Sequence, residues 1–428
     1  MRRVIQMVEL KSDIFVIPTF NDISIIYSPL RGAAFYANSE ATSIIKEYLE
    51  SGNISEEIKG TTVYDYLHKL SQIEVEEPKK KEMQNNSSGA MFILSQICNL
   101  GCSYCYAQNS RSNEVLSIKK IKAVVDSVCA NTNKKNKTFS FIGGGEPLST
   151  WDAFERSVNY IKTTEKGGFS SRIGLTTNGT LLNEERILFL KENRIVICVS
   201  FDILPDVQND QRPFSNKKTN SFEIVHNNIK MLLSNGLVPR IRSTITNKNV
   251  NLMPQMVEFV IKNYPEIKFL HFEPVTDINE NSDDFYKAYL ASFIEAKQIS
   301  KEHRVYIKNS IIHSFKRIRT RFCNGEFCVT PSSDIVSCHR ISSDREKSFE
   351  SFKFGKVTND IEIDTKSLNH VLEIFEEKSK HCSNCFAKWH CAGGCPMYRT
   401  ISTEKEQLSY CTFVKDTLTS ILDERLGR

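Results

Sequence analysis

Three cysteines in the stretch CNLGCSYCY are the first residues whose types and spacing could support chemistry. Cys98, Cys102 and Cys105 follow the pattern C-x3-C-x2-C, whereas a structural metal site normally has four protein ligands. A site with three protein ligands leaves one coordination position for a ligand from outside the chain. Thiolates favour zinc or an iron–sulfur cluster, and no histidine within the next hundred residues could complete a zinc site with three cysteines.

A second group of cysteines occupies the short, turn-rich sequence after about residue 320. Eight of the thirteen cysteines lie there: Cys323, Cys328, Cys338, Cys382, Cys385, Cys391, Cys395 and Cys411. Eight thiolates could fill two iron–sulfur clusters or two tetrahedral zinc sites, so zinc stays open as an alternative. Cys129 and Cys198 lie in a helical and a strand-like apolar pattern, and we assign them to the core.

Polar and glycine-containing motifs follow several apolar segments of the chain. They are Gly143–Pro147 (GGGEP), Thr176–Gly179 (TTNG) and Ser200–Asp202 (SFD), with Arg212 further on. Backbone exposed by glycine can approach a ligand closely, and a carboxylate suits a ligand's ammonium group. Each motif alone is more often a structural turn than a binding segment. Their shared position after strands predicts one common site.

Strands that alternate with helices must position these motifs. The expected strands are Phe92–Ile97, Thr138–Ile142, Ile173–Thr177, Ile195–Phe201, Pro239–Thr246 and Ile267–Phe272. The expected helices cover residues 117–130, 151–165, 183–193, 221–235, 251–263 and 284–302. Continuous apolar strands between helices predict a parallel sheet covered by helices. Six strand–helix units are two short of a closed barrel, so we expect an α/β fold with an open, partial barrel.

The first 80 residues predict a small α+β unit of their own. Short strands are expected at Ile14–Pro18, Ile23–Ser28 and Ala33–Tyr36, followed by helices at Glu40–Glu50, capped by Ser39, and Val63–Leu70. Residues 76–89 are charged and polar, which is typical of a linker. The expected domains are therefore residues 1–80, 90–310 and 320–428.

The bulk composition excludes several classes of protein. Hydrophobic residues make up 40% and charged residues 25%, an ordinary globular composition, and the formal net charge of +5 is too small to indicate nucleic-acid binding. Acidic residues interrupt the N-terminal stretch before a signal-peptide core could form, and the apolar runs are too short to span a membrane. We expect a cytoplasmic protein, in which thiols stay reduced and serve as metal ligands rather than disulfides.

The trio of cysteines with Tyr104, followed in order by the GGEP, TNG and SxD…R motifs, resembles the radical S-adenosylmethionine (SAM) superfamily. The resemblance implies a partial (β/α)6 barrel, a 4Fe–4S cluster on Cys98, Cys102 and Cys105, and SAM on the cluster's free iron. It implies SAM contacts from Tyr104, Gly144, Gly145, Glu146, Asn178, Ser200, Asp202 and Arg212. The family commonly has glycine where Ile203 stands, which bears on the shape of that loop.

The C-terminal cysteines resemble the SPASM extension of these enzymes, in which two auxiliary 4Fe–4S clusters each have four cysteine ligands. The resemblance assigns Cys323, Cys328, Cys338 and Cys395 to one cluster. It assigns Cys382, Cys385, Cys391 and Cys411 to the other. Ser333 replaces a glycine that is usual in the family. Three clusters would use eleven of the thirteen cysteines.

The resemblance implies an oxidoreductase that removes hydrogen from a ribosomally made precursor peptide and installs a carbon–carbon or thioether cross-link. Its implied partners are the precursor with its leader, bound by residues 1–80, and an electron donor such as flavodoxin or ferredoxin. Sulfatase-maturating enzymes are the alternative, but they carry a catalytic aspartate where this chain has His339. His339 is a candidate base, although a hydrogen bond that supports a cluster is the simpler role. A non-catalytic iron–sulfur carrier or a zinc-stabilised binding protein is the alternative from another class.

Overall fold

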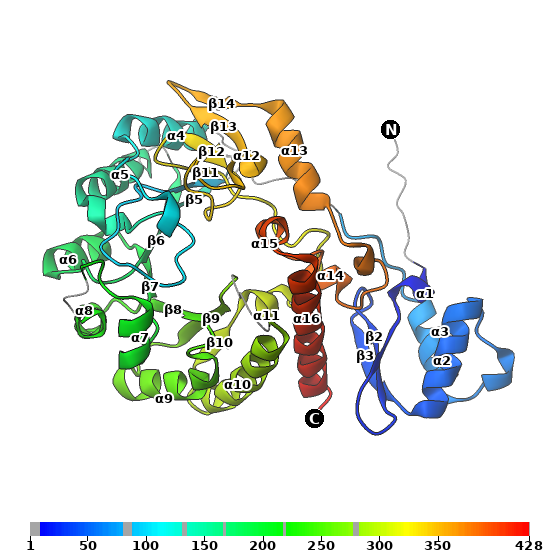
Figure 1. Ribbon diagram of the computed structural model, residues 1–428. Helices are drawn as coiled ribbons and strands as arrows, with labels where there is room; N and C mark the ends of the chain where they lie inside the picture. The colour runs from blue at the N-terminus through cyan, green and yellow to red at the C-terminus, as the bar shows by residue number, and fades with distance from the viewer. Residues whose placement is uncertain are drawn as a thin grey trace.

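The computed structural model describes residues 9–79, 88–130, 135–165, 168–216, 220–276 and 282–427. Among these residues, eleven strands form one sheet in the order β10-β9-β8-β7-β6-β5-β4-β11-β12-β13-β14. Neighbouring strands from β4 to β10 are all parallel. Figure 1 shows these strands around an arc with the helices outside it. The prediction of an α/β fold with an open barrel is confirmed.

The arc is built from repeated strand–helix units. Its strands are β4 (Gly89–Phe92), β5 (Asn136–Phe141), β6 (Ser170–Thr177), β7 (Val196–Ser200), β8 (Arg240–Ile245), β9 (Phe269–Pro274) and β10 (Tyr306–Lys308). Its helices are α4 (Ile118–Ala130), α5 (Trp151–Thr164), α6 (Glu184–Glu192), α7 (Pro205–Gln211), α8 (Ser221–Ser234), α9 (Met253–Asn263) and α10 (Ser282–Glu302). Strand β10 and helix α7 were not predicted, because each is a short segment without a clear apolar period.

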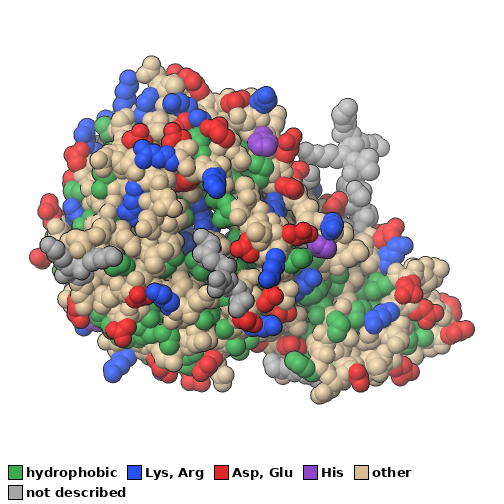
Figure 2. Space-filling view, in the orientation of Figure 1, with side chains coloured by type: hydrophobic (Ala, Val, Ile, Leu, Met, Phe, Trp, Pro, Cys, Tyr) green, Lys and Arg blue, Asp and Glu red, His purple; other side chains and the backbone are tan. Residues whose placement is uncertain are grey.

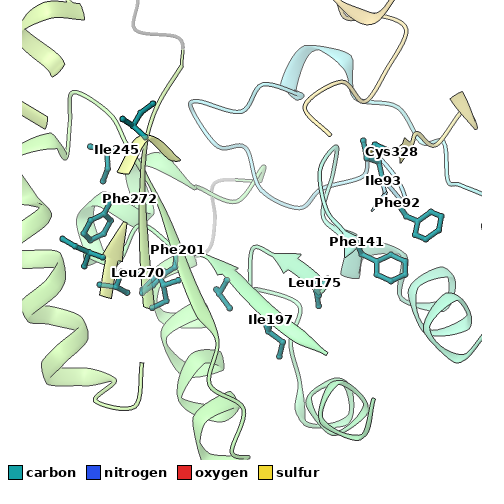
Figure 3. Packing of buried hydrophobic residues seen from close by; sticks show 14 of the residues in the cluster. Phe92, Ile93, Phe141, Leu175, Ile197, Phe201, Ile245, Leu270, Phe272 and Cys328 are labelled. Carbon is teal, nitrogen blue, oxygen red and sulfur yellow. The ribbon is translucent and has the colours of Figure 1, made fainter. Parts of the chain in front are cut away.

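The arc has an apolar outer face and a mixed inner face. Phe139 and Phe141 of β5, Ile197 and Val199 of β7, and Phe272 of β9 are fully or almost fully buried. Figure 3 shows Phe141, Leu175, Ile197, Leu270 and Phe272 on the side of the strands that faces the helices. Successive strand residues point to opposite faces, so the residues between them face the inside of the arc.

The cysteine-rich C-terminal region continues the same sheet. Strand β11 (Cys328–Val329) pairs in parallel with β4, and β12 (Asp334–Val336), β13 (Lys353–Val357) and β14 (Ile361–Ile363) follow as antiparallel neighbours. The helices here are α11 (Ser310–Ser314), α12 (Phe349–Phe352), α13 (Thr365–Glu376), α14 (Lys388–Cys391), α15 (Pro396–Ile401) and α16 (Glu404–Arg425). Short 3-10 helices cover Glu56–Ile58, Gln108–Ser110, Pro147–Thr150, Val250–Leu252 and Lys380–Cys382.

The N-terminal unit has a separate antiparallel sheet. Strands β1 (Phe15–Pro18), β2 (Ser24–Ser28) and β3 (Ala33–Ala37) lie in that order. The helices are α1 (Leu10–Asp13), α2 (Ser39–Ser51) and α3 (Thr62–Ser71). Ile26 packs with α2 and α3 on one face, whereas Ile25 belongs to the main core on the other. Figure 1 shows the sheet between its own helices and the C-terminal part of the chain.

Two details of the local predictions were wrong. Helix α2 is capped by Asn38, whose side chain accepts a hydrogen bond from the Ala41 amide at 2.9 Å, and Ser39 is its first helical residue. Strand β4 ends at Phe92 rather than at Ile97. After Phe92 the chain turns toward the cysteine loop, where Ser95 forms an isolated bridge with Val115. Residues 80–87 of the expected linker lie outside the described residues.

Candidate functional site

The trio of cysteines lies on the loop that follows β4, at the carboxyl edge of the arc. Segment 211–215 holds this loop in place: the Gly101 amide donates to the Pro213 carbonyl at 2.8 Å, and the Ser103 amide donates to the Gln211 carbonyl at 2.9 Å. Burial raises the pKa of the Cys102 thiol to about 12, and the Cys98 and Cys105 thiolates lie close enough to contribute to that rise. The three thiols therefore lie close enough to influence one another, and their joint role as cluster ligands stays a prediction.

Polar donors face the sulfur atoms of the trio. Arg111 Nη2 donates to Cys105 Sγ at 3.6 Å, and Arg111 Nη1 donates to the Cys98 carbonyl at 3.3 Å. Asn178 Nδ2 contacts Cys98 Sγ at 3.9 Å and donates to Asn99 Oδ1 at 3.0 Å. Donors directed at sulfur stabilise thiolates and the clusters that they hold. The residues present thus fit an anionic iron–sulfur group.

The glycine run after β5 packs against the trio loop. A Cβ atom on Gly145 would lie 2.1 Å from the Ile97 carbonyl oxygen, and one on Gly144 would lie 2.6 Å from Ile93 Cγ2. The Gly145 amide donates to the Ser95 carbonyl at 2.8 Å. Glycine is required at Gly145 because the two backbones touch. The glycine run therefore packs directly against residues 93–97 and fixes the position of the cysteine loop relative to the end of β5.

Glu146 is buried and its carboxylate is already engaged by the chain. Oε1 accepts from Thr177 Oγ1 at 2.7 Å and from the Leu148 amide at 3.1 Å, and Oε2 accepts from the Asn178 amide at 2.6 Å. Burial raises the pKa of Glu146, although these donors act to lower it. Glu146 ties the end of β5 to the end of β6. A direct SAM contact from this carboxylate stays a prediction, and its observed contacts are those of a positioning residue.

Asp202 connects the cysteine loop to the end of β7. Its Oδ2 accepts from Tyr104 Oη at 2.7 Å and lies 3.1 Å from Arg212 Nε, while its Oδ1 accepts from the Thr244 amide at 3.0 Å. The Arg212 guanidinium lies 5.2 Å from the centre of the Tyr104 ring. The structure thus brings together three residues that the sequence placed in one site, in contact with one another. Ser200, half-buried, ends the same strand.

The residue after Asp202 has a left-handed backbone. Ile203 is fully buried and has φ 69°, a conformation that costs a β-branched residue about 1–2 kcal/mol. Ser333, the second departure from the family pattern, has φ 70°. Both positions therefore keep the backbone that glycine would adopt freely, although neither is glycine.

The eight C-terminal cysteines separate into two sets of neighbours. Burial raises the pKa of Cys338, and the next causes are Glu326 and then Cys395. Burial and then Glu326 are also the largest causes of the raised pKa values of Cys323 and Cys328. Cys395 adds to the rise at Cys323, and Cys338 adds to the rise at Cys328. These four residues form one set of neighbouring thiols, which is the set that the resemblance assigns to one cluster.

The second set surrounds Cys391, the cysteine at the end of α14. Burial raises the pKa of Cys391 to about 12, and Cys411, Cys385 and Cys382 contribute in that order. A cavity of about 210 Å³ lies among these four thiols, and Cys395 and Gly394 also line it. A cavity bordered by thiols fits a bound group that thiolates hold.

Within the described residues, no group of three or more His, Cys, Asp or Glu side chains has the geometry to hold a single metal ion. An iron–sulfur cluster does not need its thiolates to converge on one ion, because each binds a different iron. All thirteen cysteines are free thiols.

His339 follows Cys338 and pairs with a carboxylate that the sequence did not indicate. Its Nδ1 lies 2.9 Å from Glu326 Oε2, and its amide donates to the same oxygen at 2.6 Å. Burial acts to raise the pKa of Glu326, but His339 holds it below the usual range. Glu326 and His339 come together because the chain folds back through β11 and β12, a contact that spacing alone cannot reveal.

His339 also lies beside the trio loop. Tyr106 Oη donates to the His339 carbonyl at 3.3 Å and accepts from the Gly144 amide at 3.3 Å. The Arg340 guanidinium lies 5.5 Å from the centre of the Tyr106 ring. The loop of the trio, the glycine run and the segment after Cys338 therefore meet at one place on the inner side of the arc.

An open parallel arc of strand–helix units, with a thiol trio and a glycine run at its carboxyl edge, defines a partial-barrel α/β enzyme. Residues 92–253 match the family model of the Radical SAM superfamily. This stretch of the chain is therefore a radical SAM domain. Proteins of that superfamily use a 4Fe–4S cluster and SAM.

Named relatives extend over most of the chain. The cysteine-type anaerobic sulfatase-maturating enzyme of Clostridium novyi is 25% identical over 70% of this chain and 85% of its own. The radical SAM cyclopropyl synthase TigE of Paramaledivibacter caminithermalis is 21% identical over 85% of this chain and 78% of its own. Among solved structures, native anSMEcpe with bound AdoMet shares the fold with a TM-score of 0.65 at 18% identity, over 78% of this chain and 99% of that chain.

No helix among the described residues is long and apolar enough to cross a membrane.

Proposed function

We propose that the chain is a SAM-dependent maturase that installs a carbon–carbon or thioether cross-link in a ribosomally made precursor peptide. The observation that carries the proposal is the grouping of eleven thiols into a trio at the edge of the arc and two sets of four in the C-terminal region. Three clusters account for these thiols, and Cys129 packs against the core. The assignment of Cys198 to the core was wrong: it is half-buried and lies between Ile197 and Val199, which are buried against the helices, so it faces the inside of the arc. Relatives named for maturation and for cyclopropyl synthesis support a peptide substrate.

The trio and its surroundings form the proposed cofactor site. When bound, a reduced 4Fe–4S cluster and SAM supply a 5′-deoxyadenosyl radical that removes a hydrogen atom from the substrate. The chain's residues position these groups: Arg111 and Asn178 donate to the trio's sulfurs, and the glycine run sets the height of the loop. Backbone atoms of Gly144 and the half-buried Ser200 remain our candidates for direct contact with SAM.

The two sets of four thiols are the proposed ligands of two auxiliary clusters. A cluster with four protein ligands has no iron free for a substrate, so we assign these clusters to outer-sphere electron transfer. The set that contains Cys338 lies next to Tyr106 of the trio loop. It is therefore the better placed of the two to accept an electron from a substrate radical. A flavodoxin or ferredoxin is the proposed external electron donor.

The N-terminal sheet is the proposed site for the precursor's leader. Within the described residues, the outer edges of β1 and β3 pair with no other strand, and an edge strand can accept a peptide as an added strand. Phe35 of β3 stacks on Tyr66 of α3 with ring centres 4.5 Å apart, and Tyr66 is 42% exposed. A peptide along β3 would therefore meet an exposed aromatic side chain as well as free backbone groups.

Oxidation of a cysteine or serine side chain, as in sulfatase maturation, is the second candidate, and the Clostridium novyi relative favours it. This candidate needs a base where His339 stands. His339→Gln keeps a donor for Glu326, so we expect it to retain most product formation if the residue only supports the cluster. Complete loss of product from His339→Gln, with full iron content and normal deuterium transfer into 5′-deoxyadenosine, would instead identify His339 as the base.

The experiment that tests the proposal measures SAM cleavage by anaerobically purified protein. With dithionite and SAM, we expect 5′-deoxyadenosine and methionine, and an increase in their yield with the peptide encoded by a neighbouring reading frame. Mass spectrometry of that peptide should show the loss of two hydrogens for each cross-link. A protein that holds iron but never cleaves SAM would support the non-catalytic electron carrier instead.

A further inference from the structure

A row of basic side chains crosses the inner face of the arc. The register places Arg242 of β8 opposite His271 of β9, and His271 opposite Lys308 of β10. Neighbouring strands are about 4.8 Å apart, so these three residues are direct neighbours. Ser200 of β7 pairs with Arg242 on the other side. The row therefore begins at the strand end that carries the Ser200–Asp202 motif.

The alternation of the strands points this row into the arc. Leu270 and Phe272, which flank His271, are fully buried against the helices, and so is Ile241 beside Arg242. Because successive residues of a strand face opposite ways, Arg242 and His271 face inward. Figure 2 shows Lys and Arg side chains in the hollow at the middle of this face of the molecule.

The carboxylate beside the row, Glu273, is already engaged by other groups of the chain. Glu273, two residues after His271, accepts from the Ser310 amide at 3.1 Å and lies 2.5 Å from His271 Nε2. His271 and Arg242 help to hold the pKa of Glu273 down to about 2, against the effect of burial. Glu273 is thus a permanent anion that fixes the imidazole and the end of β10.

The side chains of the two flanking cations have no such direct partner. Among the residues that the structure describes, neither the Arg242 nor the Lys308 side chain forms a hydrogen bond or an ion pair, although the Arg242 carbonyl accepts from the Phe201 amide at 2.9 Å. Lys308 Nζ lies 5.0 Å from the centre of the Phe269 ring, with Arg240 on the same ring at 4.9 Å. Burial lowers the pKa of Lys308, and the charges of Arg240 and Arg242 lower it further, whereas Glu273 and Cys198 act to raise it and offset only part of the effect. Half-buried like charges this close destabilise one another unless an anion lies between them.

We propose that Arg242 and Lys308 bind a carboxylate of the substrate, the side chain of an aspartate or glutamate close to the residue that is modified. The assignment of the carboxylate to a peptide rests on the proposed function. The guanidinium fork binds both oxygens of a carboxylate, and the ammonium adds a point charge from the second neighbouring strand. A glutamine in the same place leaves both cations unpaired, so the row selects for acidic peptides.

The test is a binding measurement with two short peptides that differ only in charge, acetyl-Gly-Glu-Gly-amide and acetyl-Gly-Gln-Gly-amide. Each is titrated into the holoenzyme with SAM present, by ligand-observed NMR. We expect the Glu peptide to bind about tenfold more tightly than the Gln peptide, the difference that one charge-assisted contact contributes. Arg242→Gln and Lys308→Gln should each abolish the preference. Arg242→Lys keeps the positive charge and should retain part of the preference for the Glu peptide. This variant therefore distinguishes an effect of charge from a general disruption of the fold.

Lys230→Gln is the matched control, because Lys230 is exposed on α8, on the outside of the arc. It should leave the preference unchanged. Equal binding of the two peptides, including no binding of either, overturns the proposal. A weaker SAM affinity in Arg242→Gln without a peptide preference in the wild type would assign the row to the cofactor's carboxylate. Displacement by inorganic phosphate alone would assign it to a phosphate. A Glu preference in a protein that never cleaves SAM would contradict the proposed function and leave this inference standing.

Discussion

The trio of cysteines and the two C-terminal sets of four use the same side chain in different surroundings. Polar donors face the trio, from Arg111 and from Asn178. The cavity beside Cys391 is lined by polar and charged side chains as well as by thiols, among them Lys388 and Arg399, and Cys328 is fully buried. The difference therefore lies in the number of thiols: a trio leaves one position for a cofactor, whereas four ligands would close a site against exchange.

The two regions touch at several points, and the contact through Tyr106 gives the comparison its functional meaning. Tyr106, at the end of the trio loop, contacts both the Gly144 amide and the His339 carbonyl. His339 follows Cys338 directly. A substrate inside the arc would therefore lie between the proposed cofactor site and the set of thiols that we propose to hold the electron acceptor.

The largest effect should come from removing the trio. Changing Cys98, Cys102 and Cys105 together to alanine should abolish SAM cleavage, because no other set of thiols leaves a position for SAM. Iron should fall from about twelve to about eight atoms per chain. Inductively coupled plasma analysis and chromatography of 5′-deoxyadenosine measure the two quantities. Residual SAM cleavage in this variant would show that SAM binds elsewhere.

Removal of a C-terminal ligand should separate hydrogen removal from product formation. Cys338→Ala should lose about four irons and all cross-linked product, while deuterium from a labelled peptide still enters 5′-deoxyadenosine. Cys129→Ala is the control, because Cys129 only packs against the core and donates to Thr164 at 3.5 Å. Normal product from Cys338→Ala protein that lacks its cluster would rule out the acceptor role.

The N-terminal sheet should affect peptide binding alone. Deleting the whole unit would remove Ile25 and Tyr27 from the main core and expose the residues that they cover, so a point substitution is the sharper test. Tyr66→Ala removes the aromatic surface beside β3 and should weaken precursor binding about tenfold, with SAM cleavage in the absence of peptide unchanged. Phe20→Ala, on a residue that is 81% exposed in the β1–β2 loop, is the control. Equal affinities by calorimetry would mean that the unit only packs against the rest of the chain.

The smallest effects should come from the two residues with a left-handed backbone. Ile203 follows Asp202 in the trio's surroundings, and Ser333 lies in the C-terminal region. Ser333→Gly should raise the free energy of unfolding by about 1 kcal/mol, because glycine adopts φ 70° without strain and the serine side chain forms no hydrogen bond among the described residues. Ile203→Gly relieves the same strain but empties a fully buried site, so it should destabilise the fold by about 2 kcal/mol. Chemical denaturation of both variants gives the two differences, and a stabilised Ile203→Gly would contradict this explanation.

The sequence predicted most of the arc because its signals are local. Five of the six main strands and their helices were found from apolar periods, whereas the predicted strand Phe92–Ile97 shares only Phe92 with β4 (Gly89–Phe92). Strand β10 is only three residues long, and its pairing with β9 depends on neighbours far away in the chain. The division of the eight C-terminal cysteines between two clusters stays a prediction, since Cys395 of one set also lines the cavity of the other.

Contacts between distant segments could not be predicted from the sequence. Glu326 and His339 meet only because β11 and β12 pair, and Glu146 proved to be tied to the end of β6. Arg242, His271 and Lys308 are separated along the chain by 29 and 37 residues, and only the register of three strands makes them a row. Residues that are brought together in this way show no pattern within a short stretch of sequence. Their contacts could therefore be recognised only once the fold was known.

In the proposed arrangement, one set of thiols is open to a cofactor and two sets are closed. Electron paramagnetic resonance of the anaerobic, dithionite-reduced protein with and without SAM, on a sample of known iron content, distinguishes the open set from the closed ones. We expect about twelve irons per chain and a spectrum in which SAM changes the signal of one cluster only, the one that the alanine variant of the trio lacks. Stoichiometric zinc with little iron, or a spectrum that SAM leaves unchanged, would contradict this arrangement.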